Sequence, residues 1–172
     1  RVFEVLDAPV AITDRMGAVD ITNPRGEIEF ENVSFRYPPG SSVSIASLEL
    51  SGVMQGADPD VDVLKSVSLK IAPGETVALV GASGSGKTTL AMLLARLYDV
   101  TSGAVRIDSK DVRDLTSTSL RTAIGVVSQD SHMFHESVRS NLLYARPDAT
   151  QEQIVEACQA AKIHEVIAAL HD

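Results

Sequence analysis

The chain has 172 residues, of which 44% are hydrophobic and 22% charged, and its formal net charge is −8. This composition is ordinary for a soluble globular protein, and a chain of this length is expected to form one domain that buries roughly 70% of its unfolded surface. No apolar run approaches the roughly 18 residues that a membrane span needs. The acidic balance argues against nonspecific nucleic-acid binding, which depends on basic surface. The single cysteine, Cys158, excludes an internal disulfide, and we expect it to be a small buried residue in a helix.

The first 25 residues are expected to form the end of a helix followed by an extended linker. Val2, Val5 and Leu6 fall on one side of a helix, which Pro9 then ends. Acidic residues interrupt this apolar pattern, so we expect no signal peptide here. Because the chain does not begin with Met, we also expect it to be part of a longer protein.

Two segments alternate between apolar and polar residues, as half-buried strands do. They are residues 27–35 and residues 63–71, and the turn Pro73–Gly74 follows the second. The intervening residues 41–62 have no clear period, and we interpret them as an insertion or a ragged hairpin. The front of the chain is therefore predicted to form an antiparallel β layer that leads into a parallel core.

The most specific motif is Gly81–Thr89, which matches the phosphate-binding loop pattern G-x-x-x-x-G-K-[ST]. The apolar run Thr76–Val80 before it predicts a parallel strand buried on both faces. Apolar residues recur at helical spacing after it, at Leu90, Leu93, Leu94 and Leu97. Strand, glycine-rich turn and helix are the order that such a loop requires, so we expect a nucleoside triphosphate to bind here.

The residue types in this loop suit a phosphate chain. Gly81, Gly84 and Gly86 carry no Cβ, so the backbone can curl and its amides can converge on an anion. The N-terminus of the following helix adds its amides and the positive end of its dipole. Lys87 is expected to reach the β- and γ-phosphates, and the Thr88 hydroxyl to ligate Mg²⁺. The residues expected to contact the nucleotide are Gly81, Ser83, Gly84, Ser85, Gly86, Lys87, Thr88 and Thr89.

Further elements are predicted after this helix. A short strand is expected over residues 104–108, a small helix over 117–122 and a second buried strand over Ile124–Val127. The pattern is helical from residue 137 onward. Asp148 or Thr150 caps a helix whose apolar residues are Ile154, Val155, Cys158 and Ala161.

With these motifs in place, the sequence resembles the nucleotide-binding domain of an ATP-binding-cassette (ABC) transporter, of the exporter type with membrane and ATPase domains on one polypeptide. The resemblance runs along the whole chain except residues 41–62, which are longer than the corresponding hairpin of the family. The matching stretches are an aromatic loop at 33–38, the Walker A motif at 81–89, the turn at 98–103, and the strand, Q-loop and helix start at 124–130 and 137–142.

The resemblance implies an α/β fold with a P-loop NTPase (RecA-like) core. Residues 1–25 would be a stem helix and linker from a membrane domain, and residues 26–172 a truncated nucleotide-binding domain. Within it, residues 26–80 would form the β subdomain, 81–130 the P-loop core and 131–172 the start of a helical subdomain.

The resemblance also assigns roles and partners. Tyr37 would stack on the adenine of ATP, and Gln129 would join Lys87 in catalysis by giving its amide oxygen to Mg²⁺ and the attacking water. Residues Gln129–Leu143, with Phe134–Leu143 foremost, would contact a coupling helix of the transmembrane domain. A second nucleotide-binding domain would complete the site in a head-to-tail dimer at the cytoplasmic face of the membrane, and nucleic acid would not be a partner.

Two motifs of the family are absent from the sequence. There is no Leu-Ser-Gly-Gly-Gln-like signature, and no four-residue apolar run ends in Asp-Glu to supply a general base. In the family both follow the point where this chain stops. We therefore expect residues 1–172 to bind Mg-ATP weakly and not to hydrolyse it.

Three alternatives remain open from the sequence. A soluble ABC-type ATPase that acts on nucleic acid or the ribosome is disfavoured by the acidic charge and by the N-terminal helix. A GTPase would carry an Asn-Lys-x-Asp motif, which the sequence lacks, and a small-molecule kinase would carry an arginine-rich lid, for which Arg139 and Arg146 are too sparse. A nucleotide-sensing module without catalysis would fit these residues but not a longer parent protein.

Overall fold

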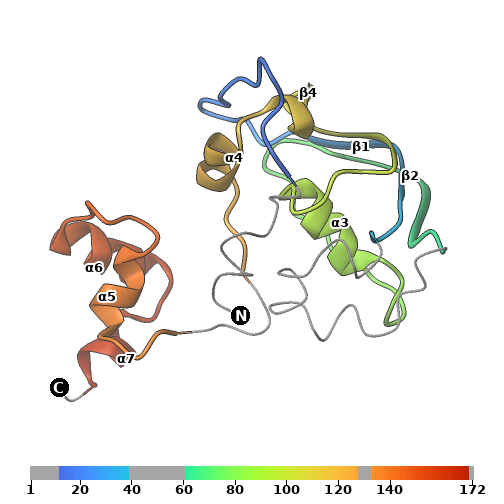
Figure 1. Cartoon of the computed structure of the whole chain (residues 1–172). Helices are drawn as coiled ribbons and strands as arrows, with labels where there is room; N and C mark the ends of the chain where they lie inside the picture. The colour runs from blue at the N-terminus through green and yellow to red at the C-terminus, as the bar shows by residue number, and fades with distance from the viewer. Residues whose placement is uncertain (1–11, 39–60, 128–132, 171–172) are drawn as a thin grey trace, which may run out of the picture. The chain divides into compact units, whose positions relative to one another are not determined.

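The computed structural model describes residues 12–38, 61–127 and 133–170, and the chain divides into two compact units (Figure 1). Unit 1 is Arg1–Gly125 and unit 2 is Val126–Asp172. The helix predicted near residue 1 and the insertion predicted over residues 41–62, apart from its last two residues, lie outside the described residues.

Unit 1 is built around a four-stranded antiparallel sheet of order β2-β1-β3-β4. The strands are β1 Ile28–Phe35, β2 Leu64–Ile71, β3 Ser102–Ile107 and β4 Lys110–Asp111. β1 is central, with Ile28 opposite Ile71 of β2 and Ile107 of β3. Three of the predicted strands, over residues 27–35, 63–71 and 104–108, are thereby confirmed, as is the antiparallel character of the front of the chain.

A β-bulge in β1 keeps its apolar side chains on one face. Phe30, Val33 and Phe35 are all buried, although the first two are three positions apart, an odd spacing that would place them on opposite faces of a regular strand. The pairing registers shift between Phe30 and Val33, and Asn32 has a left-handed φ of 46°. The bulge inserts one extra residue into the alternation of side chains. The apolar side chains before the bulge and those after it therefore lie on the same face of the strand and enter the same core.

Gly103 in β3 lies beside this bulge. Its φ is +82°, and a Cβ at this position would lie 2.4 Å from the carbonyl oxygens of both Glu31 and Asn32. Both the backbone conformation and the close approach of the two strands therefore require glycine at this position.

Helix α3 (Lys87–Leu94) lies against the sheet (Figure 1). Leu93 is buried, and Leu90, Met92 and Leu94 pack against the same cluster. The helix is shorter than predicted, since Arg96 takes a φ of +52° and Leu97 is exposed. The shared core is Ile21, Phe30, Val33, Phe35, Tyr37, Leu64, Leu93, Tyr98, Val105, Ile107, Val112, Leu115 and Leu120.

The two strands predicted for a parallel core, over residues 76–80 and 124–127, are wrong as local assignments. Neither segment has strand structure, and Val80 and Val127 are 94% and 100% exposed. A strand forms only where a neighbour accepts and donates its backbone hydrogen bonds. Among the described residues, neither segment is paired with a neighbouring strand.

The segment after β4 and the segment before β1 are bound to each other. The 3-10 helix η2 (Val112–Asp114) precedes α4 (Ser117–Ala123), which Thr116 caps by accepting from the amide of Ser119. Val19 forms a parallel bridge with Leu115. The described part of the predicted linker, residues 12–25, thus contains no helix and pairs with the segment around Leu115. Helix α4 confirms the helix predicted over residues 117–122.

The described residues of unit 2 form three short helices, α5 Val138–Leu143, α6 Gln151–Ala160 and α7 His164–Ala168. Thr150 and Gln153 form a capping box at the start of α6, which decides between the two predicted caps. Cys158 is buried, as predicted. Among the described helices of both units, none has the length and apolar character needed to cross a membrane.

Gly103→Ala is expected to destabilise the chain by about 3 kcal/mol or more, because a Cβ there adds a backbone clash to the cost of a left-handed alanine. Gly26→Ala is the matched control, since Gly26 has a φ of +86° and open space within 4 Å of the point where a Cβ would stand. It should cost only about 1 kcal/mol. Urea unfolding of both variants measures the difference in free energy of unfolding. Equal losses of stability in the two variants would contradict the close approach of Gly103 to the backbone of β1.

Candidate nucleotide-binding site

The predicted phosphate loop leads directly into α3. Gly84 has a φ of +80°, and Gly86, the N-cap of the helix, has a φ of +88°. A Cβ on Gly86 would lie 2.6 Å from Cδ2 of Leu64, and one on Gly81 would lie 2.8 Å from Oγ of Ser85. The loop is therefore folded tightly on itself, against the start of β2, in a way that these glycines permit.

The ammonium group of Lys87 lies over this loop. Its Nζ donates to the carbonyl oxygens of Gly81 (2.9 Å) and Ala82 (2.6 Å) and to Oγ of Ser85 (3.2 Å). Lys87 is also the first residue of α3, where amides without an intrahelical partner and the positive end of the helix dipole lie. A cation, a curled backbone and a helix N-terminus are the features that a phosphate-binding site requires, and the three occur together here.

The two threonines that follow Lys87 differ in exposure. Thr88 is exposed, so its hydroxyl can join phosphate oxygens in the shell of a divalent cation. A single hydroxyl fits Mg²⁺ held mainly by nucleotide and water, which is how this ion is usually bound. The described residues contain no cluster of three His, Cys, Asp or Glu side chains able to hold a metal ion.

Thr89 is buried, and its hydroxyl faces Tyr37. The two hydroxyl oxygens are 2.8 Å apart. The Tyr37 ring contacts Phe35 edge-on (centroids 4.9 Å, 82°) and Tyr98 edge-on (5.3 Å, 89°), and only 6% of the residue is exposed. Its hydroxyl also lies 3.8 Å from Sδ of Met92. Two predicted nucleotide contacts, one from the end of β1 and one from α3, are thus joined directly.

Tyr37 does not form the open stacking surface that its predicted role requires. Edge-on aromatic contacts and burial both stabilise the ring where it is. Burial also raises the pKa of the neighbouring Tyr98 hydroxyl above its ordinary value, and the proximity of Tyr37 raises this pKa further. Stacking on adenine stays a prediction, and it requires the Tyr37 ring to leave this aromatic cluster.

The remaining predicted site residues lie in the loop itself, outside the described residues, or in unit 2. Ser83 is exposed, and Gln129 lies outside the described residues, so its catalytic and metal-binding roles stay predictions. In unit 2, Phe134 is exposed and stacks on Tyr144 with ring centroids 4.6 Å apart. The Asn141 amide holds this turn by bonding both the N–H and the carbonyl of Phe134.

The sequence did not single out Met92, Arg96 or Tyr98. Met92 lies in α3 near the Tyr37 hydroxyl, Arg96 lies just beyond the helix, and Tyr98 packs against Tyr37. No local sequence pattern around Met92 or Tyr98 indicates that either residue lies near the Tyr37 hydroxyl. Only the tertiary fold brings the Tyr37 hydroxyl to Thr89 and Met92, over separations of 52 and 55 residues.

A family model described as ABC transporter matches residues 64–171, which is more than half of the chain. The chain belongs to the ABC transporter family. A similar relative is the putative multidrug export ATP-binding/permease protein YgaD of Bacillus subtilis, 44% identical over 167 residues that cover 97% of this chain and 26% of the relative. Another is the multidrug efflux ATP-binding/permease protein Rv0194 of Mycobacterium tuberculosis, 51% identical over 177 residues, which cover 100% of this chain and 13% of the relative.

A solved structure agrees with this assignment. The structure of a bacterial Atm1-family ABC exporter with ATP bound has a TM-score of 0.78 to this chain at 34% identity, over 98% of this chain and 26% of the other. The predicted fold class, a mixed α/β P-loop NTPase of the ABC type, is therefore confirmed. The chain spans about a quarter or less of the length of these family members.

Tyr37→Phe is expected to destabilise the chain by about 1–2 kcal/mol, because it leaves the buried Thr89 hydroxyl without this partner. Thr89→Val should cost a similar amount. The double variant removes both hydroxyls and should cost clearly less than the sum. Urea unfolding of the four proteins gives the coupling free energy, and additivity within about 0.5 kcal/mol would contradict a direct bond.

Proposed function

We propose that this chain is the ATP-binding part of an ABC exporter, in which ATP binding and hydrolysis by the complete protein move a substrate out across a membrane. The observation that carries the proposal is the placement of Lys87 at the first position of α3, over a loop with two left-handed glycines. Membership of the ABC transporter family supports it.

Each site residue then has a distinct role. Lys87 exchanges its bonds to the loop carbonyls for bonds to the β- and γ-phosphates, and the amides of the loop and of the first turn of α3 hold the remaining oxygens. Thr88 and Gln129 would hold Mg²⁺, which would supply charge neutralisation for the phosphate oxygens. Tyr37 binds the adenine ring once the Tyr37 side chain has moved out of the aromatic cluster.

The partners follow from the same proposal. The named relatives are ATP-binding/permease proteins and much longer than this chain, so we place a transmembrane domain on the same polypeptide, with this part at the cytoplasmic face. The exposed apolar side chains of Met133, Phe134 and Leu142 are candidates for contact with a coupling helix. A second nucleotide-binding domain supplies the signature loop in a head-to-tail dimer.

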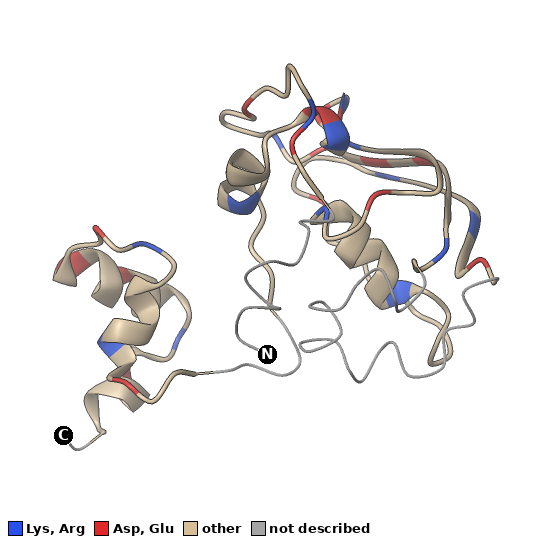
Figure 2. Ribbon diagram, viewed as in Figure 1, with Lys and Arg blue, Asp and Glu red and all other residues tan. Residues whose placement is uncertain are grey.

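The distribution of charge supports a nucleotide over a nucleic acid as the ligand. Figure 2 shows basic and acidic residues interspersed along the described chain. Several basic residues are paired with acids, as Lys70 is with Glu27 and Arg106 with Glu31. Nucleic-acid binding needs unpaired basic surface that tracks a phosphate backbone, whereas one loop and one lysine suffice for a triphosphate.

Purified residues 1–172 are expected to bind Mg-ATP weakly, and Lys87→Ala should weaken this binding by about 10–100-fold, the cost of one or two charge-assisted hydrogen bonds. Isothermal titration calorimetry measures both affinities. Lys110→Ala is the matched control, because Lys110 is an exposed lysine of β4 away from the loop. If Lys87→Ala keeps its fold by circular dichroism and binds Mg-ATP with unchanged affinity, this would contradict the assignment of Lys87 as a phosphate-binding residue.

Hydrolysis is a separate expectation. Because the sequence contains no signature motif and no general base of the Walker B type, residues 1–172 should release no phosphate above background in the presence of Mg-ATP. A phosphate-release assay tests this directly. Sustained turnover that is lost in Lys87→Ala would show that the chain carries its own general base.

A further inference from the structure

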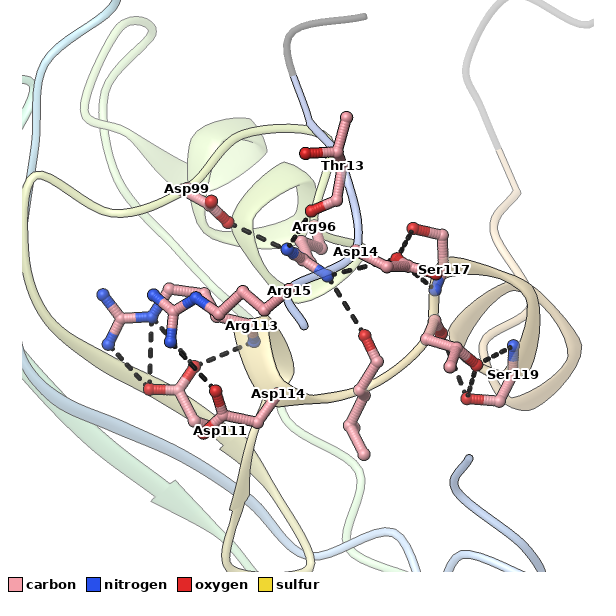
Figure 3. A network of polar contacts seen from close by, with 12 residues as sticks. Thr13, Asp14, Arg15, Arg96, Asp99, Asp111, Arg113, Asp114, Ser117 and Ser119 are labelled. Carbon is pink, nitrogen blue, oxygen red and sulfur yellow. Dashed lines mark hydrogen bonds and ion pairs between the residues drawn. The ribbon is translucent and has the colours of Figure 1, made fainter. Parts of the chain in front are cut away.

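The guanidinium of Arg96 is buried just beyond the C-terminus of α3, in the network drawn in Figure 3. Nη1 donates to the carbonyl oxygen of Leu115 (3.1 Å), Nη2 to that of Thr13 (3.0 Å) and Nε to Oδ1 of Asp99 (3.3 Å). Nη1 also lies 3.6 Å from Oδ1 of Asp14. One side chain therefore joins three segments that are far apart in the sequence.

This arrangement depends on the shape of the group. A guanidinium presents five N–H donors in a fixed planar fork, whereas a lysine ammonium is a point charge at the end of a flexible stem. A buried ion pair adds little net stability over a well-packed apolar side chain. Stability alone therefore does not account for a guanidinium at the position of Arg96.

Residues 13–21 form what we call the N-terminal strap, and they run along the segment that holds Leu115. The amide of Val19 donates to the carbonyl of Asp114 and its carbonyl accepts from the amide of Thr116. The remaining attachments are Ile21 N–H to Ser119 Oγ, the Ser117 amide to Asp14, and the ion pair of Arg15 with Asp114. Within unit 1 the strap is thus held at several points.

The strap and the phosphate loop meet opposite ends of the same helix. Lys87 begins α3 and Leu94 ends it, so the helix is a rod of about 12 Å. Thr89 and Leu93 are buried and fix its inner face. A rigid helix carries a displacement at one end to the other, and the Arg96 guanidinium is placed where the negative end of the helix dipole favours a cation.

We propose that Arg96 is a positioning residue that couples docking of the N-terminal strap to nucleotide binding at the phosphate loop. The inference rests on the proposed function, which places the strap on the connection to the transmembrane domain. With the strap docked, Arg96 holds α3 in the orientation that presents Lys87 and the first-turn amides to phosphate. By linkage, a bound nucleotide must then stabilise the docked strap by the same factor as the strap favours the nucleotide.

The test is hydrogen exchange of residues 1–172 followed by NMR, with and without saturating Mg-ATP. The probes are the amides of Val19 and Ile21, which donate to Asp114 and Ser119 in the docked strap. We expect Mg-ATP to slow their exchange at least about fivefold, the lower end of usual coupling between sites. In Arg96→Lys the slowing should be lost, and the Kd for Mg-ATP should rise by the same factor.

Arg106→Lys is the matched control, because Arg106 pairs with Glu31 across the sheet, away from the strap. It should leave both the Kd and the slowing unchanged. If Arg96→Lys does not fold, Asp14→Asn takes its place, since the Asp14 side chain is 40% exposed and meets the same guanidinium. This variant should reduce the slowing and raise the Kd by matching, smaller factors.

The outcomes separate the two proposals. Mg-ATP binding without any change in the exchange of Val19 and Ile21 overturns the coupling and leaves the proposed function standing. Slowing that persists in Arg96→Lys, or in Asp14→Asn where the first variant does not fold, also overturns it. Absence of Mg-ATP binding to the wild-type chain overturns both.

Discussion

The backbone turn from Gly84 to Gly86 is the constraint on which the rest of unit 1 depends. Gly86 combines a left-handed φ with a position where a Cβ would clash with the Leu64 side chain, so another residue here would be strained and would displace Leu64. That turn sets Lys87 at the first position of the helix and folds the loop carbonyls around its ammonium. It also directs the buried side of α3, Thr89 and Leu93, toward the sheet.

Helix α3 is consequently tied to the rest of the unit at both ends. Near its start, Thr89 contacts the hydroxyl of Tyr37, which follows β1. Beyond its end, Arg96 contacts Thr13 and Leu115. The same short helix thus orders the candidate phosphate site, the aromatic cluster and the N-terminal strap, which is why changes at any of these are expected to reach the others.

The sequence predicted those elements whose signals are local. β1, β2 and α3 follow from alternation and helical spacing. The cap of α6 was narrowed only to Asp148 or Thr150, and the bulge between Phe30 and Val33 was not predicted. The glycine-rich loop was recognisable because its residue types are fixed by the conformation itself.

The rest could not be predicted because it depends on partners distant in the chain. The apolar runs at 76–80 and 124–127 have the composition of strands, but a strand is defined by its neighbour, and here neither is paired among the described residues. Tyr37 was expected to be an open ring, yet it is buried because Phe35 and Tyr98 converge on it. Arg96 gave no signal at all, since two of its acceptors are backbone carbonyls.

The central claim, that the loop ending at Gly86 holds a triphosphate, is tested most directly by following backbone amide resonances during a Mg-ATP titration. Amides that bond phosphate oxygens shift strongly on binding. The account predicts that the largest shifts occur at Gly84, Gly86 and Lys87 and saturate together. Saturable binding that leaves these three amides unmoved and shifts others would contradict it.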